Sequence, residues 1–519
     1  MNNSDTIYAP ATPSGKGAIA IVRLSGPEAI SVAAKLFHPR GAKLFAETPG
    51  GGTRFGVIRD VEAPGGEVVD ECLAAVFRAP HSYTGEDSVE FYLHGSQYIV
   101  SSVCKLLSKF GTRMAEPGEF SRRAFVNGQM DLSQAEAVAD LIEAESAAAH
   151  DVAMSQMRGG YSKELAAMRA DLLEIAALLE LELDFAEEDV EFADRSKLRS
   201  LVENVLGKVD SMIESFALGN VIKNGVPVAI IGPTNVGKST LLNALLGENR
   251  AIVSDIAGTT RDTIEERLVL AGISFRFIDT AGIRHSTDEI ECIGIERSLQ
   301  ALARAKVVLL MLPAPELAAC GVAHCGGSES TLPYDCVSDD CTEETVKGSA
   351  CESAAGDAVA DGTLFGGLLP HSVLELLYGR SLIVLLSKSD LCDSDALLGA
   401  EAAVRNSLAA KGLETACILT ISAKTGVGTD ELKNVLISSQ NALQDHGYAC
   451  LVSNQRHWEV LRSASAALTR VLEGLSTTLP PDLLAQDLRA ALAHLGSITG
   501  EITTDEVLGE VFGRFCIGK

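Results

Sequence analysis

The sequence predicts a multidomain chain in which an α+β domain comes first and an all-α helical domain is interrupted by an inserted α/β domain. Three observations predict this order. The first part of the chain mixes short alternating strands with Gly/Pro turns, an Ala/Leu/Glu-rich stretch with helical periodicity follows and later resumes, and a glycine-rich loop lies between the two helical stretches. The predicted boundaries are 1–127 for the α+β domain, 128–222 and 441–519 for the helical parts, and 223–440 for the inserted domain.

The glycine-rich loop, Gly232 to Ser239, fits the pattern G-x-x-x-x-G-K-[ST] in full. The apolar run Val226 to Ile231 before it is typical of a buried strand, and Thr240 to Leu246 opens a helix. Glycines let backbone N–H groups close around phosphates, and the helix N-terminus adds partial positive charge. Lys238 would reach the β- and γ-phosphates, and Ser239 would ligate Mg²⁺. The loop predicts nucleotide binding at Asn235, Val236, Gly237, Lys238, Ser239 and Thr240.

Two later segments follow in the order in which a GTPase uses them. Gly258-Thr259-Thr260-Arg261-Asp262 lies about twenty residues beyond the loop, where a first switch is expected, and Thr260 would ligate Mg²⁺. The alternating strand Ile273 to Ile278 then ends in Asp279-Thr280-Ala281-Gly282. The carboxylate of this segment would hold the Mg²⁺ shell, and its glycine N–H would sense the γ-phosphate.

A guanine-reading box is predicted after the apolar strand Leu382 to Leu386. The segment Ser387-Lys388-Ser389-Asp390 resembles the pattern N-K-x-D, with Ser422-Ala423-Lys424 as its backing loop. The Asp390 carboxylate can accept from both N1–H and the exocyclic amine of guanine, whereas adenine offers no such pair of donors. Ser387 replaces the Asn that normally ties this loop to the phosphate loop, so we expect guanine specificity with weaker affinity. Together the segments predict a Ras-like P-loop GTPase domain.

The residue after Gly282 bears on hydrolysis. Many small GTPases have Gln there to orient the attacking water, but this chain has Ile283. Asn235 offers an oxygen for a monovalent cation beside the phosphates, and the polar segment Arg284 to Glu291 supplies carboxylates. The alternative is a slow switch without efficient chemistry.

The motifs Gly-Pro-Thr-Asn-Val-Gly-Lys-Ser, Gly-Thr-Thr-Arg-Asp and Asp-Thr-Ala-Gly-Ile-Arg closely resemble those of the MnmE (TrmE) family of bacterial and organellar tRNA modification GTPases. The resemblance covers nearly the whole chain apart from an insertion at 313–369. Outside the inserted domain it rests on the segments 5–9, 20–26, 83–87, 117–121, 131–137 and the terminal Phe-Cys-Ile-Gly-Lys at 515–519.

This resemblance implies that K⁺ replaces an arginine finger and promotes pairing of two G domains. K⁺ would be held by Asn235, Ser254, Ile256 and Thr259, and the water-organising carboxylate falls on Glu291. The candidate GTP-binding residues beyond the phosphate loop are Ser254, Asp255, Ile256, Ala257, Gly258, Thr259, Thr260, Asp279, Thr280, Ala281, Gly282, Lys388, Asp390, Ser422, Ala423 and Lys424.

The resemblance also implies a second site, because the N-terminal domain is similar to the tetrahydrofolate-binding fold of the glycine cleavage T-protein. Contacts to a 5-formyl or 5,10-methylene tetrahydrofolate derivative fall on Arg23, Glu90, Gln129 and Lys519. The family usually has Lys at the position of Gln129. The Gln129 amide can still form a hydrogen bond, but it lacks the positive charge of Lys. Cys516 is implicated in the modification chemistry. The candidate catalytic residues are Arg284, Glu291 and Cys516.

The function implied is that of a K⁺-stimulated GTPase acting with an FAD-dependent partner of the MnmG (GidA) type. Together they would add a carboxymethylaminomethyl or aminomethyl group at C5 of the wobble uridine, position 34, of certain tRNAs. GTP hydrolysis would drive a conformational cycle. The expected assemblies are a homodimer and a heterotetramer with the partner. A ribosome-assembly GTPase or a membrane-tethered signalling GTPase, each a switch without modification chemistry, is the alternative.

Composition limits how tRNA is bound. The net charge of −27 opposes a broad nucleic-acid face, because phosphate contacts dominate such affinity. Arg122-Arg123 is either part of a local basic patch or a solvated surface. No leader or membrane-spanning run is apparent, so we expect a soluble cytoplasmic protein whose twelve cysteines are reduced.

The insertion from Pro313 to about Leu369 is rich in Gly, Ala, Ser, Asp and Glu. We expect a disordered acidic loop there. A zinc site is the alternative, but the segment lacks a C-x-x-C pair and has one His. Its cysteines are Cys320, Cys325, Cys336, Cys341 and Cys351.

Overall fold

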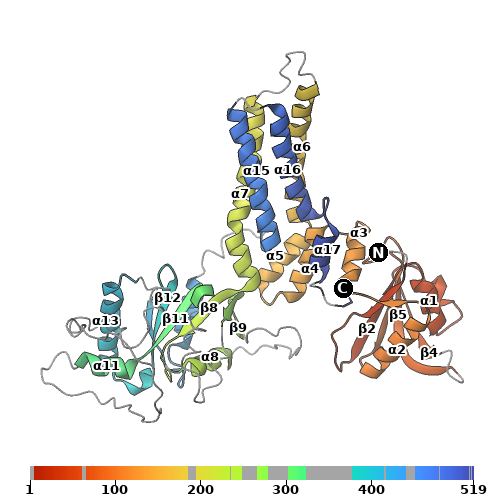
Figure 1. Ribbon diagram of the computed structural model, residues 1–519. Coiled ribbons are helices and arrows are strands. Elements are labelled where there is room, and N and C mark those ends of the chain that lie inside the picture. The colour runs from red at the N-terminus through yellow and green to blue at the C-terminus, as the bar shows by residue number, and fades with distance from the viewer. Residues whose placement is uncertain are drawn as a thin grey trace, which may run out of the picture. The chain divides into compact units, whose positions relative to one another are not determined.

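A computed structural model describes residues 5–60, 66–184, 195–233, 235–247, 266–278, 302–322, 377–413, 417–439, 451–477, 480–513, 515 and 517–518. The chain divides into two compact units, and Figure 1 labels their helices and strands. The first unit comprises Met1–Ala144, Ala149–Asn220 and Gly447–Lys519, and the second comprises Glu145–Ala148 and Val221–His446.

The N-terminal part of the first unit is a seven-stranded sheet with the order β3-β4-β5-β6-β2-β1-β7. Its pairs are antiparallel apart from the parallel pair of β1 and β7. Alternate residues of the strands, such as Val22, Phe91 and Ala74, pack against α1 and α2, which cover one face. The sheet confirms the predicted α+β class. The elements are β1 Ile7–Pro10, β2 Ile19–Ser25, α1 Ala29–Leu36, β3 Phe37–Pro39, η1 Phe45–Glu47, β4 Gly52–Asp60, β5 Glu67–Phe77, β6 Ser88–His94, α2 Gln97–Lys109, β7 Arg113–Met114 and α3 Glu119–Val126.

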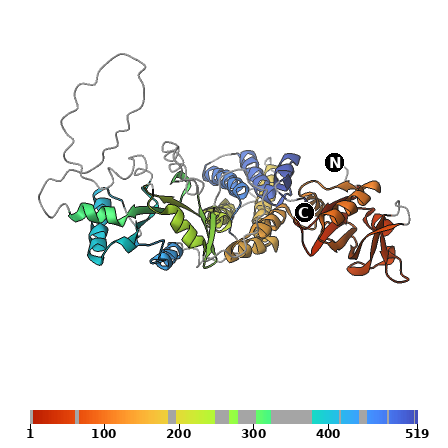
Figure 2. The ribbon, with the colours of Figure 1, turned by 90° about the horizontal axis from the view of Figure 1, so that it is seen from below.

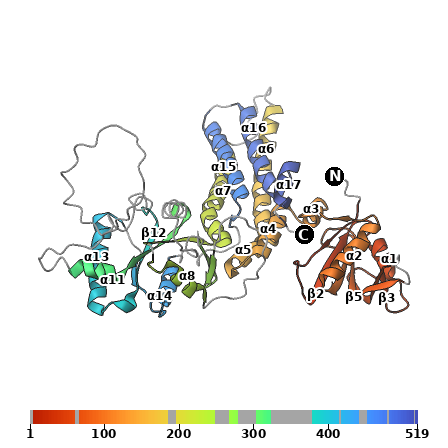
Figure 3. The same ribbon diagram turned by 60° about the horizontal axis from the view of Figure 1, so that its bottom comes forward.

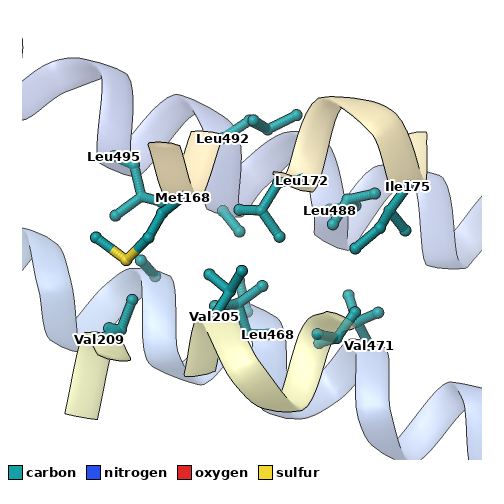
Figure 4. Packing of buried hydrophobic residues seen from close by; sticks show 14 of the residues in the cluster. Met168, Leu172, Ile175, Val205, Val209, Leu468, Val471, Leu488, Leu492 and Leu495 are labelled. Atoms are coloured by element: carbon teal, nitrogen blue, oxygen red, sulfur yellow. The ribbon is translucent and has the colours of Figure 1, made fainter. Parts of the chain in front are cut away.

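The rest of the first unit is helical, as predicted. Its four long helices, α6, α7, α15 and α16, form a bundle that Figure 2 shows nearly end-on. Residues from both sides of the inserted domain fill its core, among them Leu172, Val205, Leu468 and Leu488 (Figure 4). The helices are α4 Leu132–Glu143, α5 Ala147–Met157, α6 Gly160–Asp184, α7 Arg195–Asn224, α15 Gln455–Ser476, α16 Pro481–Thr499 and α17 Asp505–Gly513.

The second unit contains a six-stranded sheet with the order β13-β12-β11-β8-β10-β9. All its pairs are parallel except the hairpin of β9 and β10. Helices α11 and α13 lie side by side and pack on the sheet through one apolar cluster (Figure 3). The predicted buried strands at 226–231, 307–312 and 382–386 are all present. The elements are β8 Val226–Ile231, α8 Lys238–Gly247, β9 Glu266–Leu270, β10 Ile273–Phe277, β11 Val307–Pro313, α11 Ala314–Val322, β12 Ser381–Ser387, η3 Ser389–Leu391, α13 Ser394–Ala410, β13 Cys417–Thr420 and α14 Thr429–Ser438.

The start of the insertion corrects the sequence prediction. Ala314–Val322 forms α11 and not a loop. Ala314 and Leu317 are buried in the core beside the sheet, and this apolar contact stabilises the helix. The acidic composition of the whole segment gives no indication of it. The remainder of the insertion and Cys325, Cys336, Cys341 and Cys351 lie outside the described residues. Within the described part of the chain, no helix has the length and apolar character needed to cross a bilayer.

Candidate functional sites

The phosphate loop joins β8 to α8 at the carboxyl edge of the parallel sheet. Gly232 has φ +153°, and a Cβ on it would lie 2.3 Å from the carbonyl oxygen of Met311 on β11. Only glycine fits this crossing. Lys238 folds back over the loop, where its Nζ donates to the carbonyl oxygens of Gly232 at 2.7 Å and Pro233 at 2.9 Å. Burial lowers the pKa of Lys238. The loop therefore presents an ammonium group and a helix N-terminus at one point, which suits phosphate binding.

The predicted guanine box lies after β12 at the same edge. Lys388 has the left-handed backbone conformation, with φ +58°. Ser422, which follows β13, donates its hydroxyl hydrogen bond to Asp390 Oδ1 at 2.7 Å, and this bond lowers the pKa of Asp390. The backbone N–H of Ser389 donates to the carbonyl oxygen of Ile421 at 3.3 Å. These bonds join the box to its backing loop and hold an exposed carboxylate in place.

The structure brings several predicted nucleotide-site residues to one edge. Ligands of open parallel sheets bind outside the carboxyl ends of the strands, and the loops after β8, β12 and β13 all lie at that edge. Asn235, Val236, Gly237, Lys238, Ser239 and Thr240 belong to the first loop or α8, and Lys388, Asp390, Ser422, Ala423 and Lys424 to the other two. The predicted residues Ser254, Asp255, Ile256, Ala257, Gly258, Thr259, Thr260, Asp279, Thr280, Ala281, Gly282, Arg284 and Glu291 lie outside the described residues.

A second constellation lies on the N-terminal sheet. Arg23 on β2 and Glu90 on β6 are direct cross-strand partners, and Arg23 Nε donates to Glu90 Oε1 at 2.8 Å. Tyr92 donates its hydroxyl hydrogen bond to the other oxygen, Glu90 Oε2, at 2.9 Å. The Arg23 guanidinium carbon lies 5.3 Å from the ring centroid of Tyr83 and 5.7 Å from that of Phe120. A mostly buried ion pair is thus flanked by aromatic rings, which suits a planar ligand with hydrogen-bonding edges.

The other predicted residues of this constellation approach it from two directions. A Cβ on Gly85 would lie 3.1 Å from Gln129 Nε2, so the amide of Gln129 lies against the loop that carries Tyr83. A Cβ on Gly518 would lie 2.3 Å from the carbonyl oxygen of Pro10, so the C-terminal tail touches the end of β1. Ala9, before Pro10, is the cross-strand partner of Arg23. Cys516 and Lys519 lie outside the described residues.

Sequence reasoning missed Tyr83, Phe120 and Tyr92 as neighbours of the Arg23–Glu90 pair. The family-motif segments 83–87 and 117–121, which contain Tyr83 and Phe120, carry the sequence signal that could identify two of them. The prediction that Arg122-Arg123 forms a surface pair is wrong for Arg123, which is 1% exposed. Its guanidinium is paired with three carboxylates, so it contributes to no basic patch.

Family models and curated relatives match nearly the whole chain. The family models described as MnmE helical domain and GTP-binding protein TrmE N-terminus match residues 132–516 and 6–129. The tRNA modification GTPase MnmE of Christiangramia forsetii is 44% identical over 519 residues, with 100% of both chains covered. The protein of that name from Bacteroides fragilis is 46% identical over 523 residues, also with 100% of both covered. Among solved structures, the FeoB G domain of Methanococcus jannaschii is 22% identical over 41% of this chain and 95% of its own, with a TM-score of 0.23.

Proposed function

The chain belongs to the MnmE family of tRNA modification GTPases, and from this premise we propose that it is a GTPase of tRNA modification whose hydrolysis is stimulated by K⁺. The observation that carries the proposal is the position of the phosphate loop and the guanine box at the same edge of the parallel sheet. GTP would lie across this edge, with its phosphates at Lys238 and its base at Asp390.

The phosphate end of the site would bind the nucleotide through positive charge. The Lys238 ammonium has three donors, and it would exchange the carbonyl oxygens of Gly232 and Pro233 for phosphate oxygens. Ser239 and Thr260 would hold Mg²⁺, and Asp279 its water shell. When bound, Mg²⁺ neutralises charge that develops on the β- and γ-phosphate oxygens.

Asn235 is the proposed K⁺ ligand of the phosphate loop, together with Ser254, Ile256 and Thr259. Asn235 has φ +58°, a conformation that Asn tolerates better than most side chains, and its amide supplies a hard oxygen. K⁺ would supply positive charge beside the phosphates in place of an arginine finger. Glu291, with Arg284 nearby in sequence, would organise the attacking water, because Ile283 has no polar group for that purpose.

The experiment that tests this part is GTP hydrolysis by the full chain in K⁺ and in Na⁺ at equal ionic strength. We expect strong stimulation by K⁺ that is lost in Asn235→Gly, which keeps the left-handed backbone and removes the side-chain oxygen. Asn235→Ala, which strains the backbone at φ +58°, separates the two effects. Equal, slow rates in both salts would contradict the proposal and favour a plain switch.

We further propose that the Arg23–Glu90 constellation binds a one-carbon tetrahydrofolate derivative. The ion pair between aromatic rings supports this reading, as does the proximity of Gln129 to the Tyr83 loop. Lys519 would complete the contact, and Cys516 would take part in the modification chemistry. Contact between Gly518 and Pro10 supports a C-terminal tail that reaches this side of the sheet.

With an FAD-containing partner of the MnmG type, the chain would add an aminomethyl or carboxymethylaminomethyl group at C5 of uridine 34. Mass spectrometry of nucleosides from tRNA incubated with both proteins, GTP, the folate derivative and an amine donor tests this directly. The modified uridine should require both proteins and should be absent with Lys238→Ala. Modification without GTP hydrolysis would contradict the proposed coupling. The partner would also supply tRNA contacts that a chain of net charge −27 disfavours.

We propose that the N-terminal sheet forms the homodimer contact through its face opposite α1 and α2. Phe55, Leu73, Tyr92 and Ile21 are successive cross-strand partners on this face. Phe55 is 42% exposed and Leu73 is 46% exposed, and such an apolar row is typical of an association surface. Leu73→Lys should shift the chain to monomer in sedimentation velocity. Leu44→Lys, a change at an exposed leucine outside the row, should leave the dimer intact.

A further inference from the structure

Arg123 on α3 is almost completely buried and yet carries a full charge. Removing a guanidinium from water costs free energy, and well-packed apolar residues of similar volume often serve stability as well or better. The position of Arg123 therefore calls for an explanation other than stability alone. Its contacts supply one, because they extend to the loop that borders the Arg23–Glu90 constellation.

The Arg123 guanidinium connects three parts of the chain. Its Nη2 donates to Asp5 Oδ1 at 2.6 Å and to Glu119 Oε1 at 3.1 Å, and its Nη1 donates to both carboxylate oxygens of Glu86 at 3.3 Å. The planar guanidinium holds its donors in a rigid fork, so it fixes its partners relative to one another. Arg123 thereby fixes Glu86, in the loop 82–87 before β6, relative to α3.

The loop 82–87 is fastened at further points. Ser25 at the end of β2 donates to Glu86 Oε2 at 2.7 Å, and its hydroxyl lies 2.6 Å from that of Thr84. Asn127, which follows α3, donates its amide hydrogen bond to the carbonyl oxygen of Thr84 at 2.7 Å. The loop is therefore held between β2 on one side and the α3 segment on the other.

Tyr83 is the residue through which this loop reaches the constellation. Its hydroxyl lies 2.8 Å from that of Ser121 on α3, and its ring packs against the Arg23 guanidinium. Phe120, also on α3, lies near the same guanidinium. The same helix thus supplies Phe120, Ser121 and Arg123. A displacement of the loop would move the Tyr83 ring away from Arg23.

We propose that Arg123 and Glu86 form a positioning pair that holds the Tyr83 ring against Arg23 and so sets the ligand site of the N-terminal domain. Neither Arg123 nor Glu86 is assigned a contact with the ligand; each acts through Tyr83. The inference rests on the proposed binding of a one-carbon tetrahydrofolate at Arg23 and Glu90. It adds Tyr83 as a residue of that site and identifies what holds Tyr83 there.

The test is a double-mutant cycle of Arg123→Lys and Tyr83→Phe in the full chain, with 5-formyltetrahydrofolate as the probe in isothermal titration calorimetry. Arg123→Lys keeps the positive charge but removes the planar arrangement of hydrogen-bond donors. Tyr83→Phe keeps the aromatic ring but removes the hydrogen bond to Ser121. Arg122→Lys is the matched control, the same change at the next position of α3. Glu86→Gln, which retains an oxygen acceptor for Ser25, replaces Arg123→Lys in the cycle if that variant does not fold.

We expect Arg123→Lys to raise the Kd about tenfold and Tyr83→Phe to raise it about fivefold. The double variant should raise the Kd by much less than the product of these two factors, because both changes act through the Tyr83 ring. The control should bind like the wild type. A purely structural role for Arg123 would instead lower the fraction of binding-competent molecules and leave Kd unchanged, which calorimetry separates from weakened affinity. Either that result or fully additive effects would overturn the inference.

Failure of the underlying function has a different outcome. Arg23→Ala serves as the reference, because it removes the group that Tyr83 packs against. Wild-type binding that Arg23→Ala abolishes, combined with unchanged Kd in the Arg123 and Glu86 variants, would overturn the positioning pair alone. Absence of binding by the wild type, or binding that does not depend on Arg23, would overturn the proposed folate site and this inference with it.

Discussion

Ser387 Oγ donates a hydrogen bond to the carbonyl oxygen of Leu312, 3.1 Å away on the neighbouring strand. Ser387 is the last residue of β12 and is 3% exposed. A hydroxyl has one donor, and here that donor is used on β11. The guanine box is therefore tied to the end of the adjacent strand, and this side chain has no second donor for the phosphate loop.

Ser387→Asn should strengthen nucleotide binding. An amide has two donors, so one can reach the phosphate loop while the other replaces the bond to Leu312. We expect the Kd for GDP to fall about tenfold, the effect of one additional hydrogen bond worth ~1.4 kcal/mol. Titration with a fluorescent GDP analogue measures it. Ser387→Ala is the control, and equal affinities for the Asn and Ala variants would count against this account.

Asp390→Asn should change base preference from guanine to xanthine. The carboxylate accepts two hydrogen bonds from guanine, whereas the Asn amide offers one acceptor and one donor, which match N1–H and the C2 carbonyl of xanthine. We expect GTP affinity to fall at least about 100-fold, because the substitution leaves a polar group in the site without a partner. XTP should become the better substrate. Ser422→Ala, which removes the hydrogen bond to Asp390 Oδ1, should weaken GTP binding without making XTP the better substrate.

The sequence predicts those parts of the fold and site that depend on local pattern. Continuous apolar runs mark β8, β11 and β12, because strands of a parallel sheet are buried on both faces. The phosphate loop is recognisable since Gly232 and Gly237 adopt backbone conformations that favour glycine.

What sequence reasoning missed depends on contacts between distant segments. Arg123 and Asp5 are separated by 118 residues, and Arg123 and Glu86 by 37, so no local pattern indicates that these charges meet in the interior. The stacking of Tyr83 on Arg23 likewise follows from the fold. For α11, the acidic composition of the insertion outweighed the apolar spacing of Ala314 and Leu317 in the prediction.

Glu136 should make the helical part of the first unit sensitive to acid. The carboxylate is buried, with His457 Nε2 at 2.5 Å from Oε2 and bonds of 3.0 Å from Arg456 to both oxygens. Burial alone raises the pKa of Glu136, but His457 and Arg456 outweigh it and lower the pKa from 4.5 to about 2. Because the folded pKa is the lower one, the stabilisation is fully present above pH 4.5 and is lost as the pH falls towards 2.

The shift corresponds to about 3 kcal/mol of unfolding free energy. Urea unfolding, followed by far-UV circular dichroism between pH 6 and pH 2.5, measures it. Glu136→Gln should remove this part of the pH dependence and lower stability at neutral pH, because Arg456 then lacks its charged partner. Glu473 is an exposed carboxylate on α15 that belongs to no ion pair found among the described residues, so Glu473→Gln is the control. If the unfolding free energies of the wild type and of Glu136→Gln changed with pH in the same way, the assignment to Glu136 would be contradicted.

Gly518→Ala should separate tRNA modification from GTP hydrolysis. Gly518 has φ +102°, and an added Cβ would lie 2.3 Å from the carbonyl oxygen of Pro10, which is backbone and cannot rotate away. The substitution therefore displaces Gly518 from the end of β1, and the proposed site residues Cys516 and Lys519 are close to Gly518 in sequence. We expect modification to fall at least about tenfold, a loss of ~1.4 kcal/mol in transition-state stabilisation, while the GTPase rate and melting temperature stay unchanged. Gly513→Ala is the matched control, because nothing lies within 4 Å of its Cβ position. Nucleoside mass spectrometry and phosphate release measure the two activities, and an equal loss in both would mean that the tail acts on the whole fold and not on the N-terminal site.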